Sequence, residues 1–162
     1  MIAAADINVT RIPAGFGQWP ELLAVIGASF AYMDGVIDPP SSAHRLTPES
    51  LRDKAEAEVG FIALAGEEIA GCAFLAEKAD HFYLGKLAVA PAHQGYGIGR
   101  KLLQAAEEHA RTSGKNLIEL QTRIELTGNQ ELFAKLGFVE TARTAHQGYD
   151  RPTSVTMRKA LA

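Results

Sequence analysis

Three alternating glycines follow an apolar segment and stand directly before a helical pattern. Gly95, Gly97 and Gly99 lack a Cβ, so the backbone can turn sharply and point several consecutive N–H groups at one anion. The first turn of the following helix adds unpaired N–H donors and a partial positive charge. The spacing therefore predicts a phosphate-binding site, and with it a cosubstrate that carries a pyrophosphate.

Two better-known phosphate-binding motifs do not match this segment. The dinucleotide fingerprint is G-x-G-x-x-G with an acidic residue about 20 positions later, whereas these glycines follow G-x-G-x-G without a suitably placed carboxylate. The nucleoside-triphosphate loop requires Lys and then Ser or Thr after its last glycine, but Arg100 and Lys101 follow Gly99. A turn whose glycines serve only packing is the remaining alternative.

Three motifs in this part of the chain resemble one family, in the same order. Residues 94–99, Gln-Gly-Tyr-Gly-Ile-Gly, resemble the Q/R-x-x-G-x-G/A loop of the GNAT superfamily, the acyl-CoA-dependent N-acyltransferases. Residues 87–91 resemble the fourth strand of that family, and residues 133–138, Phe-Ala-Lys-Leu-Gly-Phe, resemble its later L/Y-x-K-x-G-F element. The motifs span residues 84–138, and the resemblance implies the GNAT fold for the whole chain.

Hydrophobic periodicity predicts the element order β-α-α-β-β-β-α-β-α-β-β. Strands are expected at residues 7–12, 61–65, 69–75, 81–89, 117–124, 138–144 and 153–159, and helices at residues 19–30, 48–58, 98–113 and 129–136. Together with the resemblance, this order predicts an α/β (α+β) fold of GNAT type. Its central sheet is expected to be mixed and mostly antiparallel, with about seven strands and helices on both faces.

Length and composition predict one domain over residues 1–162. Hydrophobic residues make up 47% and charged residues 22% of the chain, which argues against disorder. No apolar run approaches the roughly 18 residues of a membrane-spanning helix. A net charge of −3 argues against a nucleic-acid partner. No secretory-signal pattern is found, so a cytoplasmic location is expected.

Metal-binding side chains are sparse. Cys72 is the only cysteine, so an internal disulfide is excluded; its apolar segment predicts a buried thiol rather than a reactive one. The histidines show no pairing typical of zinc sites, and His109 lies on the apolar stripe of a predicted helix. No metal is therefore expected.

The resemblance implies acetyl-CoA as the cosubstrate, lying where the strand before the glycine loop parts from the strand after the next helix. The backbones of Leu87 and Val89 would pair with the pantetheine arm, and the Val89 N–H would polarise the thioester carbonyl. The residues implied in cofactor binding are Leu87, Ala88, Val89, Gln94, Gly95, Tyr96, Gly97, Ile98, Gly99, Arg100, Asn129 and Phe133.

The acceptor must present a neutral amine, because an ammonium group has no lone pair with which to attack. In the family, a carboxylate on the fourth strand can take the proton, and Tyr83 stands at that position here. His81, two residues earlier, and Glu125, at the end of the neighbouring strand, are alternatives. A histidine has the pKa best suited to a base near neutral pH. These three residues and Val89 are the candidate catalytic residues.

Two positions depart from the family pattern. Many members have a tyrosine that protonates the leaving thiolate where this chain has Phe133. The usual asparagine seven residues earlier is Leu126 here, so Asn129 either binds CoA from a shifted position or caps the helix. General acid catalysis is typically worth about 10²–10⁴-fold, so weakened activity is expected rather than none.

The segments 34–46 and 145–152 border the acceptor side in this fold. Tyr32, Asp34, Asp38, Tyr149 and Asp150 are the candidates for binding a cationic amine. Turn formation is the alternative role for each of them.

The sequence therefore predicts an acetyl-CoA-dependent N-acetyltransferase that acts on a small-molecule or amino-acid-like primary amine by direct transfer in a ternary complex. A protein or peptide acetyltransferase and a catalytically weak CoA-binding regulatory module are the alternatives. The expected partner is a small-molecule amine, with no nucleic acid and no membrane; a homodimer is the open alternative to a monomer.

Overall fold

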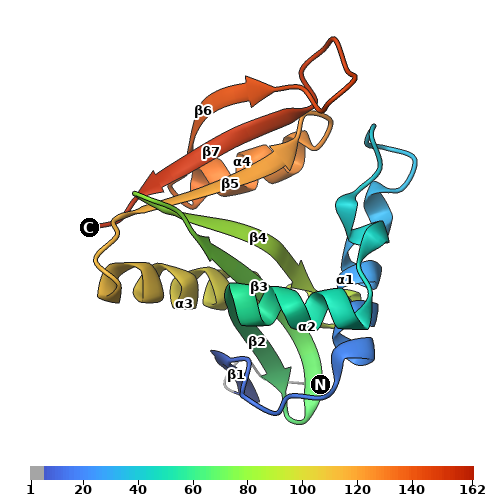
Figure 1. Ribbon diagram of the computed structural model, residues 1–162, viewed down its shortest axis with the longest axis vertical. Helices are drawn as coiled ribbons and strands as arrows, with labels where there is room; N and C mark the ends of the chain where they lie inside the picture. Colours follow the sequence, from blue (N-terminus) through green and yellow to red (C-terminus); the bar gives the residue numbers. More distant parts are fainter. Residues whose placement is uncertain (1–5) are drawn as a thin grey trace.

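A computed structural model describes residues 6–162, and Figure 1 shows a central sheet surrounded by helices. Within these residues the sheet has seven strands in the order β1-β2-β3-β4-β5-β7-β6. Neighbouring strands pair antiparallel except β4 and β5, which are parallel. The predicted mixed, mostly antiparallel sheet is confirmed.

The elements follow the predicted order, with bounds that differ by a few residues. The strands are β1 (Ile7–Arg11), β2 (Val59–Ala65), β3 (Glu68–Glu77), β4 (Phe82–Val89), β5 (Leu117–Arg123), β6 (Val139–Thr144) and β7 (Ser154–Ala160). The helices are α1 (Trp19–Phe30), α2 (Pro48–Ala57), α3 (Ile98–Thr112) and α4 (Thr127–Lys135), with short 3₁₀ turns η2 (Ala31–Met33), η3 (Ser42–Arg45) and η4 (Pro91–His93).

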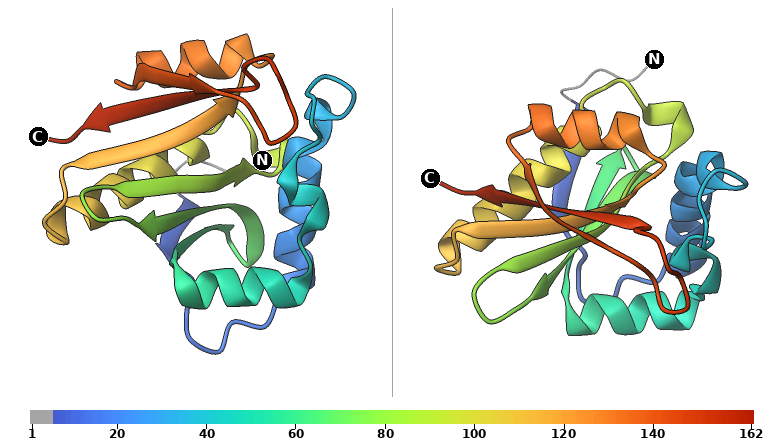
Figure 2. Two further views of the ribbon diagram at one scale, coloured as in Figure 1. Left: turned by 45° about the horizontal axis from the view of Figure 1, so that its top comes forward. Right: turned by 90° about the horizontal axis from the view of Figure 1, so that it is seen from above.

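Helices cover both faces of the sheet, as Figure 2 shows. Leu102 and Ala106 of α3 pack with Ile118 of β5 in the core on one face, which Phe133 of α4 also contacts. Leu22 of α1 and Leu51 of α2, among others, form the core on the other face. The sheet therefore lies between two helical layers, and both layers border the strands that form the site.

Two residues expected to be structural are confirmed as such. His109 of α3 packs edge-to-face on Phe61 and Phe82, with ring centroids 6.1 and 5.5 Å away. Cys72 of β3 is fully buried, and burial raises the pKa of its thiol to about 12. Neither side chain is placed for chemistry at neutral pH.

The start of α2 follows its sequence signals, whereas the start of α4 does not. Thr47 Oγ1 accepts the Ser50 N–H at 3.0 Å, and Ser50 Oγ accepts the Thr47 N–H at 2.9 Å. This reciprocal cap fixes the start of α2. By contrast, α4 begins at Thr127 without a side-chain cap. The alternative in which Asn129 caps the helix is therefore wrong, because Asn129 lies inside the first turn.

A β-bulge in β4 changes which residues face each side of the sheet. Pairing with β3 shifts between Cys72–Ala88 and Phe74–Gly85, so two residues of β4 oppose one of β3. Lys86 lies in this bulge with φ of 51°, and its carbonyl accepts a hydrogen bond from Cys72 Sγ at 3.4 Å. Leu84 packs in the α3-side core but Ala88 in the opposite core. The bulge therefore reverses the alternation of the strand.

Strands β4 and β5 pair over only a short stretch at the start of each strand. The register contains only Phe82–Ile118 and Tyr83–Glu119 in the described chain. Beyond these pairs the strands diverge, and Figure 1 shows β5 running with β7 while β4 stays with β3. The predicted parting of these two strands is confirmed.

No helix in the described part of the chain is both long and apolar enough to span a bilayer.

Candidate active site

A cavity of about 380 Å³ lies where β4 and β5 part. Residues 83–87 of β4 and residues 120–123 of β5 form two of its walls. The segment between α1 and α2 and the start of α4 close it from opposite faces of the sheet. Residues of both helical layers therefore line the cavity.

The glycine loop has the geometry of an anion-binding turn. Gly95 and Gly97 have φ values of 89° and 78°, the left-handed region that glycine adopts without a steric cost. Gly97 is the N-cap of α3 and gives no side-chain cap, and the first helical bond runs from the Lys101 N–H to the Gly97 carbonyl. A Cβ at either glycine would meet nothing within 4 Å. The loop thus has open space in front of it and uncapped first-turn donors, which fits a pyrophosphate.

The other residues of the loop hold it in place. Gln94 Nε2 donates to the Val89 carbonyl at 3.2 Å, which ties the loop to the end of β4. Ile98 is buried and Tyr96 packs against the same core, whereas Arg100 is exposed. Only the backbone of Ile98 is therefore available to a ligand, while the Arg100 side chain is free to reach one.

The proposed oxyanion donor already has a partner. The Val89 N–H donates to Ser29 Oγ of α1 at 3.2 Å, while Ala90 N–H donates to the Ala70 carbonyl of β3. The Val89 amide therefore points away from β3, as the resemblance requires. Ala88 pairs with Cys72 of β3 and is buried, so its side chain packs in the core and does not face the cavity.

The three candidate bases lie in different places. Tyr83 lines the cavity, but burial and the nearby Glu119 and Glu58 raise the pKa of its phenol. Tyr83 is therefore protonated at neutral pH, which suits a proton donor and not a base. The structure does not bring His81 or Glu125 into the cavity lining.

His81 and Glu125 have structural partners instead. His81 precedes β4, with Nδ1 at 2.6 Å from Asp80 and Nε2 at 3.7 Å from Glu119. Glu125 follows β5, and its Oε2 accepts the Asp38 N–H at 3.2 Å. His81 thus lies at the closed end of the β4–β5 pair, away from the opening.

Phe133 and Leu126, the two positions that depart from the family pattern, both line the cavity, as does Asn129. Phe133 lines it and packs edge-to-face on Phe138, with ring centroids 5.8 Å apart. Asn129 Nδ2 donates to Tyr32 Oη at 3.0 Å, although Tyr32 itself is not part of the cavity lining. The Phe133 and Asn129 side chains are placed to contact a ligand in the cavity.

The acidic candidates for acceptor binding join the two loops and do not line the cavity. Asp38 Oδ1 accepts from Tyr149 Oη at 2.6 Å and Asp38 Oδ2 from Arg151 at 3.2 Å. Asp34 pairs with His44 at 2.7 Å, and Asp150 is exposed. The charges of Asp34 and Asp38 are thus directed at neighbouring side chains, and an amine bound by these residues stays a prediction.

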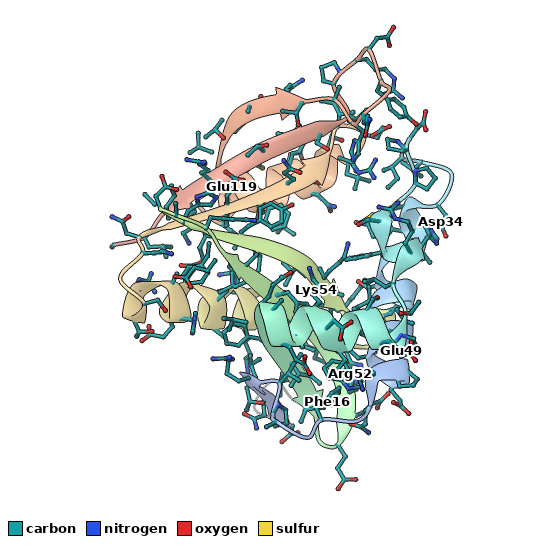
Figure 3. All side chains as sticks on the ribbon, in the orientation of Figure 1. Phe16, Asp34, Glu49, Arg52, Lys54 and Glu119 are labelled. Carbon is teal, nitrogen blue, oxygen red and sulfur yellow. The ribbon has the colours of Figure 1, made fainter. Side chains whose placement is uncertain are left out.

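The cavity contains functional groups that the sequence analysis did not single out. Lys54 of α2, Lys86 of β4 and Arg123 of β5 line it, together with His146. Figure 3 shows Lys54 beneath the opening between β4 and β5, while Asp34 lies on the outer side of the segment after α1. His146 is a base within the cavity lining. Burial and the nearby Arg123 lower the pKa of its imidazole. Their elements were predicted, but only the tertiary structure brings these side chains together.

Within residues 6–162, no group of three or more His, Cys, Asp and Glu side chains is arranged to hold a metal ion.

Comparison with known proteins agrees with this geometry. The model of the acetyltransferase (GNAT) family matches residues 28–138. An IAA acetyltransferase of Azospirillum brasilense is 29% identical over 130 residues, which cover 78% of this chain and 82% of that protein. An L-methionine sulfoximine/L-methionine sulfone acetyltransferase of Salmonella typhimurium is 38% identical over 60 residues, 37% of this chain and 35% of that protein.

Solved structures share the fold over almost the whole chain. The crystal structure of a GNAT family acetyltransferase from Elizabethkingia anophelis with acetyl-CoA bound has a TM-score of 0.68 at 20% identity. The match covers 96% of this chain and 99% of that one. Because the family model spans residues 28–138, more than half of the sequence, the chain belongs to the GNAT family of N-acetyltransferases.

Proposed function

We propose that this enzyme transfers the acetyl group of acetyl-CoA to a primary amine of a small molecule, including amino-acid-like acceptors, in a ternary complex. The observation that carries the proposal is the cavity between β4 and β5, which residues of both helical layers line and which lies on the strand that leads to the uncapped glycine loop. Relatives whose names give small-molecule acceptors support the substrate class.

The chain's own groups can supply each part of the reaction. Residues 94–99 hold the pyrophosphate, and the free edge of β4 at Leu87 and Val89 holds the pantetheine arm. The amine nitrogen attacks the thioester carbonyl carbon, the C–N bond forms, the C–S bond breaks and the amine loses one proton. The Val89 N–H exchanges Ser29 for the carbonyl oxygen, where negative charge develops.

Proton transfer in this proposal uses two groups of the cavity lining. His146 is neutral at physiological pH because its pKa is lowered, so it accepts the amine proton directly or through water. Tyr83 is protonated because its pKa is raised, so it donates to the leaving thiolate. This assignment replaces the acid that Phe133 cannot provide.

A screen of acetyl-CoA with a broad panel of amines tests the proposal, with thiol release as the readout and product mass as confirmation. Turnover with small amines and not with peptides is the expected result. Preference for peptides would favour the protein acetyltransferase. CoA binding by calorimetry with no thiol release for any amine would favour the regulatory module. The proposal includes a cytoplasmic location and leaves a homodimer as the alternative to a monomer. Cell fractionation and the mass of the protein in solution test these two points separately.

A further inference from the structure

The cavity between β4 and β5 has an unbalanced positive charge. Lys54, Lys86 and Arg123 line it, and in the part of the chain that the structure describes no Asp or Glu does. Lys54 is compensated, because its Nζ lies 2.8 Å from Glu58 Oε2. Lys86 and Arg123 have no carboxylate oxygen within 4.0 Å among residues 6–162.

Lys86 and Arg123 instead bind neutral acceptors that fix their positions. Lys86 Nζ donates to Ser42 Oγ at 2.7 Å. Arg123 donates to the carbonyls of Pro39 and Pro40 at 2.6 and 3.0 Å. A guanidinium has five N–H donors and an ammonium three, so both groups keep donors for a ligand. They are anchored cations that no carboxylate contacts directly within residues 6–162.

Partial burial makes this arrangement costly without an anion. Desolvation is the largest effect and lowers the pKa of both groups. Lys54, Arg45 and Arg123 lower the pKa of Lys86 further and Glu58 raises it, whereas Glu125, Tyr149 and Asp38 raise the pKa of Arg123. Charges taken from water are usually paired. An anion that entered the cavity would restore the balance through charge-assisted hydrogen bonds.

We infer that the acceptor carries a carboxylate in addition to its amine, and that Lys86 and Arg123 bind this carboxylate in the cavity; the inference rests on the proposed function. The phosphates of acetyl-CoA are assigned to residues 94–99, outside the cavity lining. The anion in the cavity therefore comes from the second substrate.

The same charges select against other acceptors and help the reaction. A polyamine would place further positive charge beside Lys86 and Arg123, so it is repelled. For a bound amino acid, nearby cations disfavour the ammonium form and thus raise the fraction of neutral amine. Lys86 and Arg123 therefore position the acceptor and select for its carboxylate, and their charge also favours the neutral form of its amine.

Matched acceptors test the inference. Amino acids are compared with their amides, which keep the amine and the side chain but lack the carboxylate. In the wild type, kcat/KM is expected to be at least about 10-fold higher for the acid than for the amide, as for loss of a hydrogen bond to a charged group. Equal values, or a preference for amides or polyamines, would overturn the inference while leaving acetyl transfer intact.

Variants assign the effect to the two residues. Lys86→Gln and Arg123→Gln are expected to raise KM for the acid about 10-fold and leave KM for the amide and for acetyl-CoA unchanged, while Arg123→Lys partly rescues. Lys135→Gln, at the exposed end of α4, is the control and should change neither. Equal losses for acid and amide would show a merely structural role and contradict the inference.

A binding measurement separates this inference from the proposed function. If no amine in the screen is acetylated, the proposed function fails. Calorimetry with N-acetyl amino acids and their amides, in the presence of CoA, then still decides the carboxylate site. Binding of the acid alone, lost in Lys86→Gln, supports the site, and binding of neither or of both equally overturns it.

Discussion

The Val89 N–H and the Ser29 hydroxyl form a hydrogen bond of 3.2 Å between β4 and α1. Val89 supplies the amide that we assign to the thioester carbonyl. Ser29 is a buried polar residue of α1, the helix that packs on the face of the sheet opposite α3. Under the proposed assignment, substrate binding would therefore exchange the partner of this amide and not fill an unpaired donor.

Replacing Ser29 with Ala tests this exchange. The Val89 N–H would lose its internal partner, so stability should fall by about 1–3 kcal/mol, the cost of an unsatisfied buried group. Because the thioester oxygen no longer competes with a hydroxyl, kcat/KM for acetyl-CoA should be retained or raised. Thermal unfolding and steady-state kinetics measure the two effects. A loss of about 10²-fold or more in kcat would instead show that the hydroxyl itself contacts the carbonyl oxygen.

Gly97→Glu should abolish acetyl-CoA binding while the fold survives. The new carboxylate would lie where the pyrophosphate is assigned, and the positive φ would strain any side chain by about 1–2 kcal/mol. Gly114→Glu is a matched control, because Gly114 has a φ of 81° and equally open surroundings at the other end of α3. Both variants should lose similar stability, but only Gly97→Glu should lose calorimetric affinity. Equal affinities would remove the glycine loop from the site.

The pH dependence should report His146. Its pKa is lowered from the ordinary 6.5, and the neutral form that accepts a proton exists above that pKa. Activity should therefore be present at neutral pH and fall as the pH drops through a value below 6.5. His146→Asn should remove this acidic limb and lower kcat by about 10²-fold or more. His44→Asn, in the exposed pair with Asp34, should keep the limb, and a limb that survives in His146→Asn would assign the base elsewhere.

Phe133→Tyr should raise kcat and leave KM nearly unchanged. The added hydroxyl would lie in the cavity and could donate a proton as the C–S bond breaks, which acts in the transition state only. Tyr83→Phe should have the opposite effect, with kcat reduced by about 10²-fold. If the two phenols share one role, Phe133→Tyr should raise kcat more in the Tyr83→Phe background than in the wild type. A large loss in Phe133→Tyr with intact CoA binding would mean that Phe133 serves as an apolar wall.

Cys72→Ala should retain turnover and show no acyl-enzyme. The thiol is fully buried with a pKa of about 12, so almost no thiolate is available as a nucleophile. Intact-mass analysis during turnover should detect no added acetyl group, and an acetyl group on Cys72 would contradict direct transfer. A modest loss of stability is expected, because the Sγ contact with the Lys86 carbonyl disappears.

The sequence predicted the elements well because their signals are local. The predicted helices at 48–58 and 98–113 match α2 and α3 to within a residue or so, because helix-forming and helix-ending side chains act within one turn. The start of α4 was missed because Leu126 offers no capping side chain. The parting of β4 and β5 came from the resemblance, since no local pattern encodes how long two strands stay paired.

The structure gives the predicted acceptor-side residues other partners, for a reason of connectivity. Asp34, Asp38 and Tyr149 have the residue types that bind amines, and the sequence placed their loops near the site. The Asp38 and Tyr149 side chains bind each other across the two loops, with a separation of 111 positions, which sequence spacing does not show. Lys86 and Arg123 were missed because single cations on strands are usually solvated, and only the fold places both of them in one cavity whose described lining contains no carboxylate.

The one extra residue in the β4 bulge decides which side chains of the strand face each side of the sheet. Ahead of Lys86 the even-numbered side chains face α3, and after it the odd-numbered ones do. A substitution in this strand therefore changes one side chain only. A one-residue deletion would instead move every later residue to the other face of the sheet, and it would reorient the Val89 amide and the start of the glycine loop. The site therefore depends more on the number of residues in β4 than on the identity of most of its side chains.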